Sequence, residues 1–269
     1  MRCPACGGEL NLLECSASCL NCESEFFRKN SIADFFVGKT ELPPFYNDPA
    51  YLQGVKKMAG MHESQYNINS VTGKVEMYMK REMLKITNSI QPPAVDIGCG
   101  TGSFHYLLDH PADVVGIDVS DDLLQIAVKR FPGVDFIKCD INNPPFKTAS
   151  LETVFCLFTL EHVFYLEKFL MSLESLLSPT GRIYAALPTE GGLTWSVLRS
   201  ISNIKYSNRF NVNYKKVAEK EHCNHLITIE NTIKKLFKVE KKVTIPFRIG
   251  GYHLNLARLL RLRKYNANR

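Results

Sequence analysis

A glycine-rich turn is the most specific chemical feature of this sequence. An apolar run at residues 94–97, which includes the acidic Asp96, leads directly into it. The turn contains Gly98, Cys99, Gly100 and Gly102. Glycines here would let backbone N–H groups approach a ligand closely, and a helix that begins next would add further free N–H groups. The Gly-x-Gly-x-Gly spacing differs from the Gly-x-Gly-x-x-Gly loop that binds a dinucleotide pyrophosphate, so it favours another small ligand.

Carboxylates also mark the ends of the next two apolar runs. Asp118 and Val119 end one run, and Asp140 and Ile141 lie just after the following one. A carboxylate can accept hydrogen bonds from both vicinal hydroxyls of a ribose at once, and it can accept from the exocyclic amine of adenine. The positions predict a ribose contact at Asp118 and an adenine contact at Asp140.

Four cysteines near the start of the chain have the spacing of a metal site. They form two Cys-x-x-Cys pairs: Cys3, Cys6, Cys19 and Cys22. The two-residue gap lets both thiolates of a pair turn toward one ion, and four thiolates complete a tetrahedral Zn²⁺ shell without an open position. Cys15 is surplus, because using it in place of Cys19 would abandon the tight spacing to Cys22. We expect one structural zinc ion.

These residues require a sheet that brings the ends of several strands together. From residue 94 on, short apolar runs alternate with segments of helical spacing. The expected strands are 94–97, 114–117, 134–137, 153–158 and 183–187, and the expected helices are 103–109, 121–130 and 163–177. This alternation predicts an α/β fold, with a mostly parallel sheet, helices on both faces and a ligand site at the carboxyl ends of the strands. Helices at 51–59, 74–88 and 228–236 and a strand at 239–245 are expected outside this run.

Composition divides the chain into three parts. Residues 1–37 form a cysteine-rich module. Residues 38–90 are expected to hold a linker and N-terminal helices that cap the site, because the prolines at 42–45 favour extended backbone. Residues 91–269 form the main domain, with an insert at about 189–227 behind the fifth strand.

Residues 94–187 resemble the class I S-adenosylmethionine (SAM) dependent methyltransferase domain, of the type 11 kind, with its motifs in order. The resemblance implies a Rossmann-like fold, SAM as cofactor, glycines near the methionine and ribose portions, Asp118 at the ribose and Asp140 at the adenine. One stretch departs from the family, whose fourth strand usually opens with an Asp followed by an apolar run, whereas residues 151–154 here read Leu-Glu-Thr-Val. The cysteine module is similar to a zinc ribbon.

The turn Leu160-Glu161-His162 after the fourth strand resembles the Leu-Glu-His turn of small-molecule and lipid-head methyltransferases. Methyl transfer from a sulfonium is an in-line displacement, so alignment of the acceptor supplies most of the catalysis. A base is needed only when the acceptor keeps its proton. His162 is the expected base, because this turn borders the methyl group in the family and imidazole titrates near neutral pH. A capping or hydrogen-bonding role at the start of the helix is the alternative.

Polar residues in and before the insert are candidates for recognising the acceptor, because inserts at this point usually cap the acceptor pocket in the family. They are Glu161, Glu190, Trp195, His222 and His225. His222 and His225 lack the i, i+4 spacing of a zinc-binding helix, so acceptor recognition or plain loop structure is favoured over a metal.

The net charge of +6 originates in the C-terminal quarter. Residues 196–269 hold seventeen Lys and Arg against four Glu and no Asp. Such a segment suits an anionic partner, whether nucleic acid, a phosphate-bearing small molecule or an acidic membrane, or it forms a solvated basic face. Within it, residues 254–264 place leucines and basic side chains on different faces of a helix. This pattern predicts an amphipathic helix that makes weak peripheral contact with a membrane or packs on the domain.

The bulk composition limits the class of protein. The chain has 269 residues, of which 45% are hydrophobic and 22% charged, enough for one full-size core and a small appendage. No run approaches the ~18 apolar residues that a membrane-spanning helix needs, and the first residues lack an apolar signal core. We expect a cytoplasmic protein, in which nine cysteines favour a metal over disulfides.

The sequence is compatible with three functions. The first is SAM-dependent methylation of a small or lipid- or nucleotide-linked anionic acceptor, such as a sugar of a cell-surface polysaccharide pathway. The second is RNA methylation, because ribosomal RNA guanine-N1 methyltransferases also carry an N-terminal zinc module, although their fourth ligand is a later histidine. The third is a non-catalytic SAM-binding protein with a zinc module, which the intact glycine and carboxylate motifs disfavour.

Overall fold

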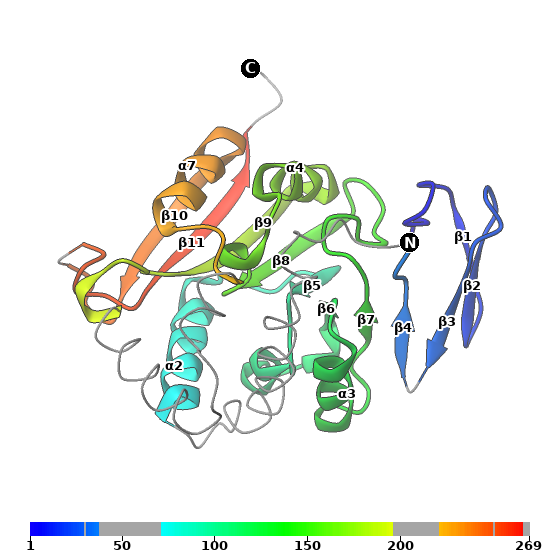
Figure 1. Ribbon diagram of the computed structural model, residues 1–269, viewed down its shortest axis with the longest axis horizontal. Helices are drawn as coiled ribbons and strands as arrows, with labels where there is room; N and C mark the ends of the chain where they lie inside the picture. Colours follow the sequence, from blue (N-terminus) through cyan, green and yellow to red (C-terminus); the bar gives the residue numbers. More distant parts are fainter. Residues whose placement is uncertain (30, 38–70, 196–220, 250, 266–269) are drawn as a thin grey trace, which may run out of the picture.

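A long, mostly parallel sheet forms the centre of the protein. The computed structural model describes residues 1–29, 31–37, 71–195, 221–249 and 251–265 (Figure 1). The parallel strands are β5 (Ala94–Ile97), β6 (Val114–Asp118), β7 (Phe136–Lys138), β8 (Leu151–Leu157) and β9 (Leu177–Pro188). Their order, β7-β6-β5-β8-β9, continues into the antiparallel strands β11 (Ala257–Lys264) and β10 (Phe237–Ile245). The α/β fold with a mostly parallel sheet is thus confirmed.

Helices cover both faces of this sheet (Figure 1). Alternate residues of β8 show the two faces: Val154 and Cys156 belong to the core cluster that contains residues of α4 (Leu166–Leu176) and α7 (Leu226–Leu236). Phe155 and Leu157 belong to the cluster that contains residues of α2 (Val71–Ile86). Strands buried on both sides need apolar side chains at every position, which accounts for the continuous apolar runs in the sequence.

The helix α3 (Asp121–Arg130) illustrates why these segments are helical. The Ser120 side chain accepts a hydrogen bond from the Leu123 backbone N–H, two Asp residues occupy the first turn, and Lys129 and Arg130 end the helix. Each of these features favours its end of a helix. The expected helix at 103–109 is instead a 3-10 helix, η2 (Ser103–Leu107), and shorter ones occur at η3 (Pro111–Asp113) and η4 (Leu160–His162).

The cysteine-rich module forms an antiparallel meander that extends the same sheet. It contains β1 (Leu10–Leu12), β2 (Ser16–Cys19), β3 (Glu25–Lys29) and β4 (Ile32–Asp34). The last of these strands pairs in parallel with β7, with Ile32 opposite Phe136 and Asp34 opposite Lys138. Over the described residues the sheet therefore has eleven strands, and the module shares its backbone hydrogen bonding with the main domain. The predicted linker at 42–45 and helix at 51–59 lie outside the described residues.

The amphipathic helix expected at 254–264 is wrong. Residues 257–264 form β11, which pairs with β9 on one side and β10 on the other, and its Leu259, Leu260 and Leu262 are buried. Apolar side chains must face both sides of such a strand, and the short leucine run fits both helical and strand periods. No helix among the described residues is long and apolar enough to cross a membrane.

Ion pairs also occupy the basic side chains of this strand. Arg258 lies 2.7 Å from Glu230, and Arg261 and Arg263 each lie 3.2 Å from Glu240. The three arginines therefore share two carboxylates, and Arg182 also pairs with Glu240. The predicted membrane contact through 254–264 loses the helix on which it rested, and Leu259 and Leu260 are buried, whereas Leu254 is 50% exposed.

Replacing a leucine of β11 should therefore destabilise the whole sheet. Leu260 is 1% exposed, so Leu260→Ala should lower the free energy of unfolding by about 2–5 kcal/mol. Ile227→Ala on α7 is the control, because Ile227 is 60% exposed and should change it by less than about 0.5 kcal/mol. Urea unfolding measures both. A Leu260→Ala chain as stable as the control would contradict the assignment of this segment to a buried strand.

Candidate functional site

The glycine turn lies between the carboxyl end of β5 and η2. Gly98 and Gly100 have φ values of 72° and 54°, which favour glycine. A Cβ atom on Gly98 would lie 2.6 Å from the Thr159 side chain, so this glycine is needed for packing against the turn after β8. Among the residues that the structure describes, a Cβ on Gly100 would meet only Leu123, at 4.0 Å. In this part of the chain nothing packs tightly against Gly100, so a ligand could approach its backbone.

Asp118 links the glycine turn to the end of β6. It is 8% exposed, and its two carboxylate oxygens accept hydrogen bonds from the backbone N–H groups of Gly100 and Ser120, each at 2.9 Å. Burial raises the pKa of Asp118, and the N–H groups oppose that rise by stabilising the charged form. Each oxygen keeps a lone pair for a ligand. The neighbouring Val119 is half exposed, whereas Cys99 is buried under the turn.

Asp140 lies in the loop that follows β7. Its Oδ1 accepts from the backbone N–H and the side-chain amide of Asn142, at 2.9 and 3.0 Å. The Cys139 N–H donates to the Asp118 carbonyl at 3.1 Å, which places this loop next to the end of β6. Ile141 is partly buried and packs against the core. Asp96 thus lies within β5, Asp118 ends β6 and Asp140 follows β7, which are adjacent strands of the sheet.

A buried lysine beside the glycine turn was not predicted from the sequence. Lys80 of α2 is 6% exposed, and its ammonium lies 2.6 Å from the Glu76 carboxylate and 2.6 Å from the Ser103 hydroxyl. Burial raises the pKa of Asp96 to about 7, an effect that the Lys80 charge opposes. The only sequence signal was the i, i+4 spacing of Glu76 and Lys80, which is common on exposed helix faces.

Acidic and histidine side chains meet beyond the ends of β8 and β9. Glu190 is buried, and its Oε1 lies 2.5 Å from the His222 Nδ1. The His222 ring contacts the His162 ring edge-on, with centroids 4.5 Å apart. The His162 Nδ1 lies 3.2 Å from the Glu221 carbonyl oxygen. We name Glu161, His162, Glu190 and His222 the acid–histidine cluster.

Two other elements hold this cluster in place. The Thr189 N–H donates to the Leu256 carbonyl at 3.1 Å, so the segment leading into β11 fixes the backbone next to Glu190. Asn224 donates from its backbone N–H to the Glu161 carbonyl and from its side chain to the Leu160 carbonyl, both at 3.1 Å. The segment just before α7 is thereby hydrogen-bonded to the Leu-Glu-His turn.

The other two residues proposed to recognise the acceptor, His225 and Trp195, lie outside the acid–histidine cluster. His225 is exposed and is the N-cap residue of α7, where its carbonyl accepts from the Ile229 N–H at 3.0 Å. Trp195 is partly buried in the turn that follows β9. The described contacts join neither side chain to the acid–histidine cluster. The structure thus brings together four of the six residues that the sequence singled out as the base or as acceptor contacts.

Glu161 is the most perturbed carboxyl of the cluster. It is 2% exposed, and burial together with the negative charge of Glu190 raises its pKa to about 8. Near neutral pH the Glu161 side chain therefore carries a proton. A neutral acid beside a carboxylate and two imidazoles forms a group that can exchange protons with a ligand.

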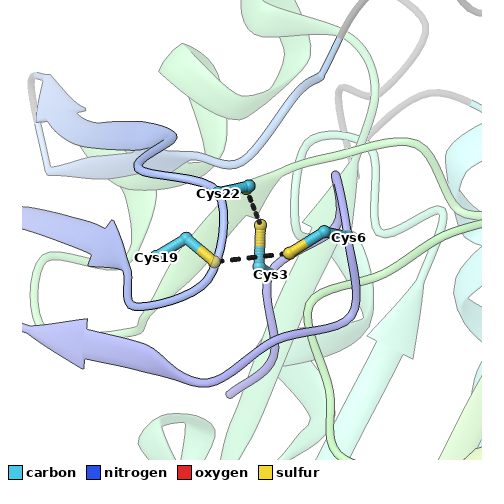
Figure 2. A group of neighbouring side chains, drawn as sticks. All are labelled: Cys3, Cys6, Cys19 and Cys22. Carbon is cyan, nitrogen blue, oxygen red and sulfur yellow. Dashed lines mark hydrogen bonds between the residues drawn. The ribbon is translucent and has the colours of Figure 1, made fainter.

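The four predicted cysteine ligands converge at the tip of the meander. Figure 2 shows Cys3 and Cys22 with sulfurs 3.7 Å apart and Cys6 and Cys19 with sulfurs 3.4 Å apart. All four sulfurs lie within 4.8 Å of one another. A tetrahedron with Zn–S bonds of about 2.3 Å has edges of about 3.8 Å, so this arrangement fits one zinc ion. Cys15 is exposed and lies outside the group, which is the only such group in the described part of the chain.

Residues 95–185 match the methyltransferase domain family. A ubiquinone/menaquinone biosynthesis C-methyltransferase, UbiE, from Campylobacter jejuni is 29% identical over 115 residues, which is 40% of this chain and 45% of the relative. A demethylmenaquinone methyltransferase from Paenarthrobacter aurescens is 33% identical over 93 residues, 34% of this chain and 37% of the relative. The chain thus spans less than half the length of these two curated relatives.

Solved structures share the fold at low sequence identity. A SAM-dependent methyltransferase from Thermotoga maritima superposes with a TM-score of 0.58 at 17% identity, over 80% of this chain and all of the other. The N-methyltransferase NodS from Bradyrhizobium japonicum, bound to S-adenosylhomocysteine, gives 0.53 at 15% identity, over 81% of this chain and 99% of the other. Geranyl diphosphate C-methyltransferase from Streptomyces coelicolor gives 0.53 at 11% identity, over 84% and 100%.

The raised pKa of Glu161 predicts a pH dependence of stability. Between pH 4.5, the ordinary pKa, and about 8, the unfolded chain loses this proton while the folded chain keeps it. The free energy of unfolding should therefore fall by on the order of 1 kcal/mol per pH unit in this window and level off above it. Glu161→Gln should lack this component when urea unfolding is measured from about pH 5 to 8.5.

The matched control is Glu167→Gln, which changes an exposed carboxyl on α4. Its stability should follow the wild-type pH dependence. Equal slopes in all three chains would show that Glu161 ionises at an ordinary pH.

Proposed function

Because its central domain belongs to the class I SAM-dependent methyltransferases, we propose that this chain methylates a small anionic acceptor, free or linked to a lipid or nucleotide. A sugar of a cell-surface polysaccharide pathway would be one such acceptor. The acid–histidine cluster carries this proposal, because it places ionisable side chains beyond β8 and β9, near the glycine turn. One histidine can bind an anionic group while another receives a proton.

The residues around the glycine turn are suited to hold SAM, which supplies a methyl group on a sulfonium. Asp118 would accept from the ribose hydroxyls, and Asp140 from the adenine amine. The backbone at Gly98, Gly100 and Gly102 would border the methionine portion. The ammonium of Lys80 would offset the carboxylate of that portion, since it is the buried positive charge beside the turn.

His162 is the proposed base, and the His222 ring beside it is a second group that could take a proton. With Nδ1 of His222 donating to the Glu190 carboxylate, Nε2 of His222 is the acceptor atom of the neutral ring. The Glu190 carboxylate would stabilise the imidazolium that forms when His222 takes a proton. Proton transfer is required only for an acceptor that keeps its proton, and alignment serves every acceptor.

The cysteine group is proposed to bind one structural Zn²⁺. The backbone N–H groups of Gly8 and Asn21 point at the sulfurs of Cys6 and Cys19, at 3.4 and 3.3 Å, and stabilise thiolates. The Ser24 hydroxyl lies 3.1 Å from the Cys22 sulfur, where it can donate to the thiolate that zinc requires. Four sulfurs leave no open position for catalysis.

RNA methylation is the alternative, and the module's charge gives it little support. Residues 1–37 contain three Lys and Arg against five Asp and Glu. Binding to a phosphate backbone depends on an excess of positive charge. In the sheet, the module also lies beyond β7, several strands away from the acid–histidine cluster at β8 and β9.

The acceptor class can be tested with SAM labelled on its methyl group. Extracts separated into small-molecule, lipid and RNA fractions should show label in the small-molecule or lipid fraction. If a base is needed, His162→Gln or His222→Gln should slow transfer by about 10²–10⁴-fold, the usual contribution of acid–base catalysis. His225→Gln is the control, because its ring is exposed at a helix cap. Label confined to RNA would contradict the proposal and support the alternative.

The zinc proposal predicts one tightly held zinc ion per chain. Cys19→Ser should abolish it, because three thiolates leave the tetrahedral shell incomplete. Cys15→Ser is the matched control and should retain it, since Cys15 lies outside the cluster. Elemental analysis of the purified chains decides. Full zinc in Cys19→Ser with loss in Cys15→Ser would exchange the two assignments.

A further inference from the structure

The cysteine module contacts β7 and the loop that follows it at three points along the chain. At the end of β7, just before the loop, the Phe35 N–H donates to the Lys138 carbonyl at 2.8 Å. In the middle of the loop, the side-chain amide of Asn143 donates to the Pro4 carbonyl. At the end, the Arg2 N–H donates to the Pro145 carbonyl at 3.2 Å. The loop, which we name the adenine loop (residues 139–146), is thus bound to the module on one side.

The other side of the adenine loop faces the cofactor residues. The Cys139 N–H donates to the Asp118 carbonyl at 3.1 Å, and the Asn143 N–H donates to the Asp140 carbonyl at 3.0 Å. Between β7 and β8 the chain forms no helix that could hold this loop from behind. Its position therefore depends on the bond to β6, on the bonds to the module, and on the packing of Ile141 and Phe146 against the core.

The module's contact at Pro4 lies inside the first cysteine pair. Pro4 follows Cys3 and precedes Cys6, and the turn is closed by the Gly7 N–H on the Cys3 carbonyl and the Cys3 N–H on the Gly8 carbonyl, both at 2.8 Å. Within this turn Ala5, Cys6 and Gly7 are exposed, and bound metal is what fixes such turns in small cysteine modules. The direction of the Pro4 carbonyl, and hence the anchor for Asn143, is tied to the metal site.

From these contacts we infer that the zinc module is part of the cofactor site: it holds the adenine loop in place through Asn143, so that metal loading sets the affinity for SAM. Asn143 is a positioning residue, acting on the nucleotide through Asp140. The sequence places the cysteine module and the cofactor residues in separate parts of the chain, whereas the pairing of β4 with β7 and the Pro4–Asn143 bond connect them. This inference rests on the proposed SAM site.

Titration calorimetry of the full chain with S-adenosylhomocysteine tests it. Asn143→Ala should weaken binding by about three- to tenfold, the range for one lost hydrogen bond, with zinc content and melting temperature unchanged. Wild-type chain stripped of zinc by a chelator should bind at least as weakly, and added Zn²⁺ should restore it. Asn88→Ala is the control, because the exposed Asn88 bonds to Arg261 away from the module.

A double-mutant cycle separates positioning from general destabilisation. If Asn143 acts through Asp140, its replacement should have little further effect in an Asp140→Ala background, whereas independent damage would add. Unchanged affinity in Asn143→Ala and in the zinc-free chain would overturn the inference while leaving the SAM site intact. A wild-type chain that does not bind S-adenosylhomocysteine would instead overturn the proposed function. A wild-type chain that binds it but contains no zinc would overturn the zinc site and its link to affinity.

Discussion

The parallel pairing of β5, β6 and β7 brings the glycine turn and its carboxylates together. Parallel strands that share a register end at one edge of the sheet, so residues far apart in sequence become neighbours there. Asp118 then accepts a hydrogen bond from Gly100, 18 residues earlier in the chain, and the Cys139 N–H reaches the Asp118 carbonyl. Without this pairing the glycine turn would have no carboxylate beside it. Burial raises the pKa of Asp118, and the N–H groups around this carboxylate limit that rise.

The same sheet explains how the two ends of the chain take part in the site. At one edge, β4 extends the sheet beyond β7 and brings the cysteine turn to the adenine loop. At the other, β11 lies against β9, and the segment leading into it bonds to Thr189 next to Glu190. Residues 95–185 match the methyltransferase domain family. The strands added at both edges of the sheet lie outside this range.

Local sequence features predicted the parts of the site that depend on local chemistry. Alternating glycines and the acidic residues after apolar runs identified the turn and its carboxylates, because each lies within a few residues of its own strand. Cysteine spacing identified the four cysteines whose sulfurs converge, because each pair forms one turn. The leucines of 257–264 did not reveal a strand, since a strand buried on both faces shows no alternation. Lys80 and the Pro4–Asn143 bond had no local signal, because each joins segments distant in sequence.

We propose that SAM binds where β5, β6 and β7 end, with the nucleotide against Asp118 and the adenine loop. A crystal structure of the full, zinc-loaded chain with S-adenosylhomocysteine is the decisive measurement. We expect ribose hydroxyls on the Asp118 carboxylate, the adenine against Asp140, and the methionine portion between Gly100 and Lys80. A nucleotide bound elsewhere, or bound at this edge without contact to Asp118 and the adenine loop, would contradict it.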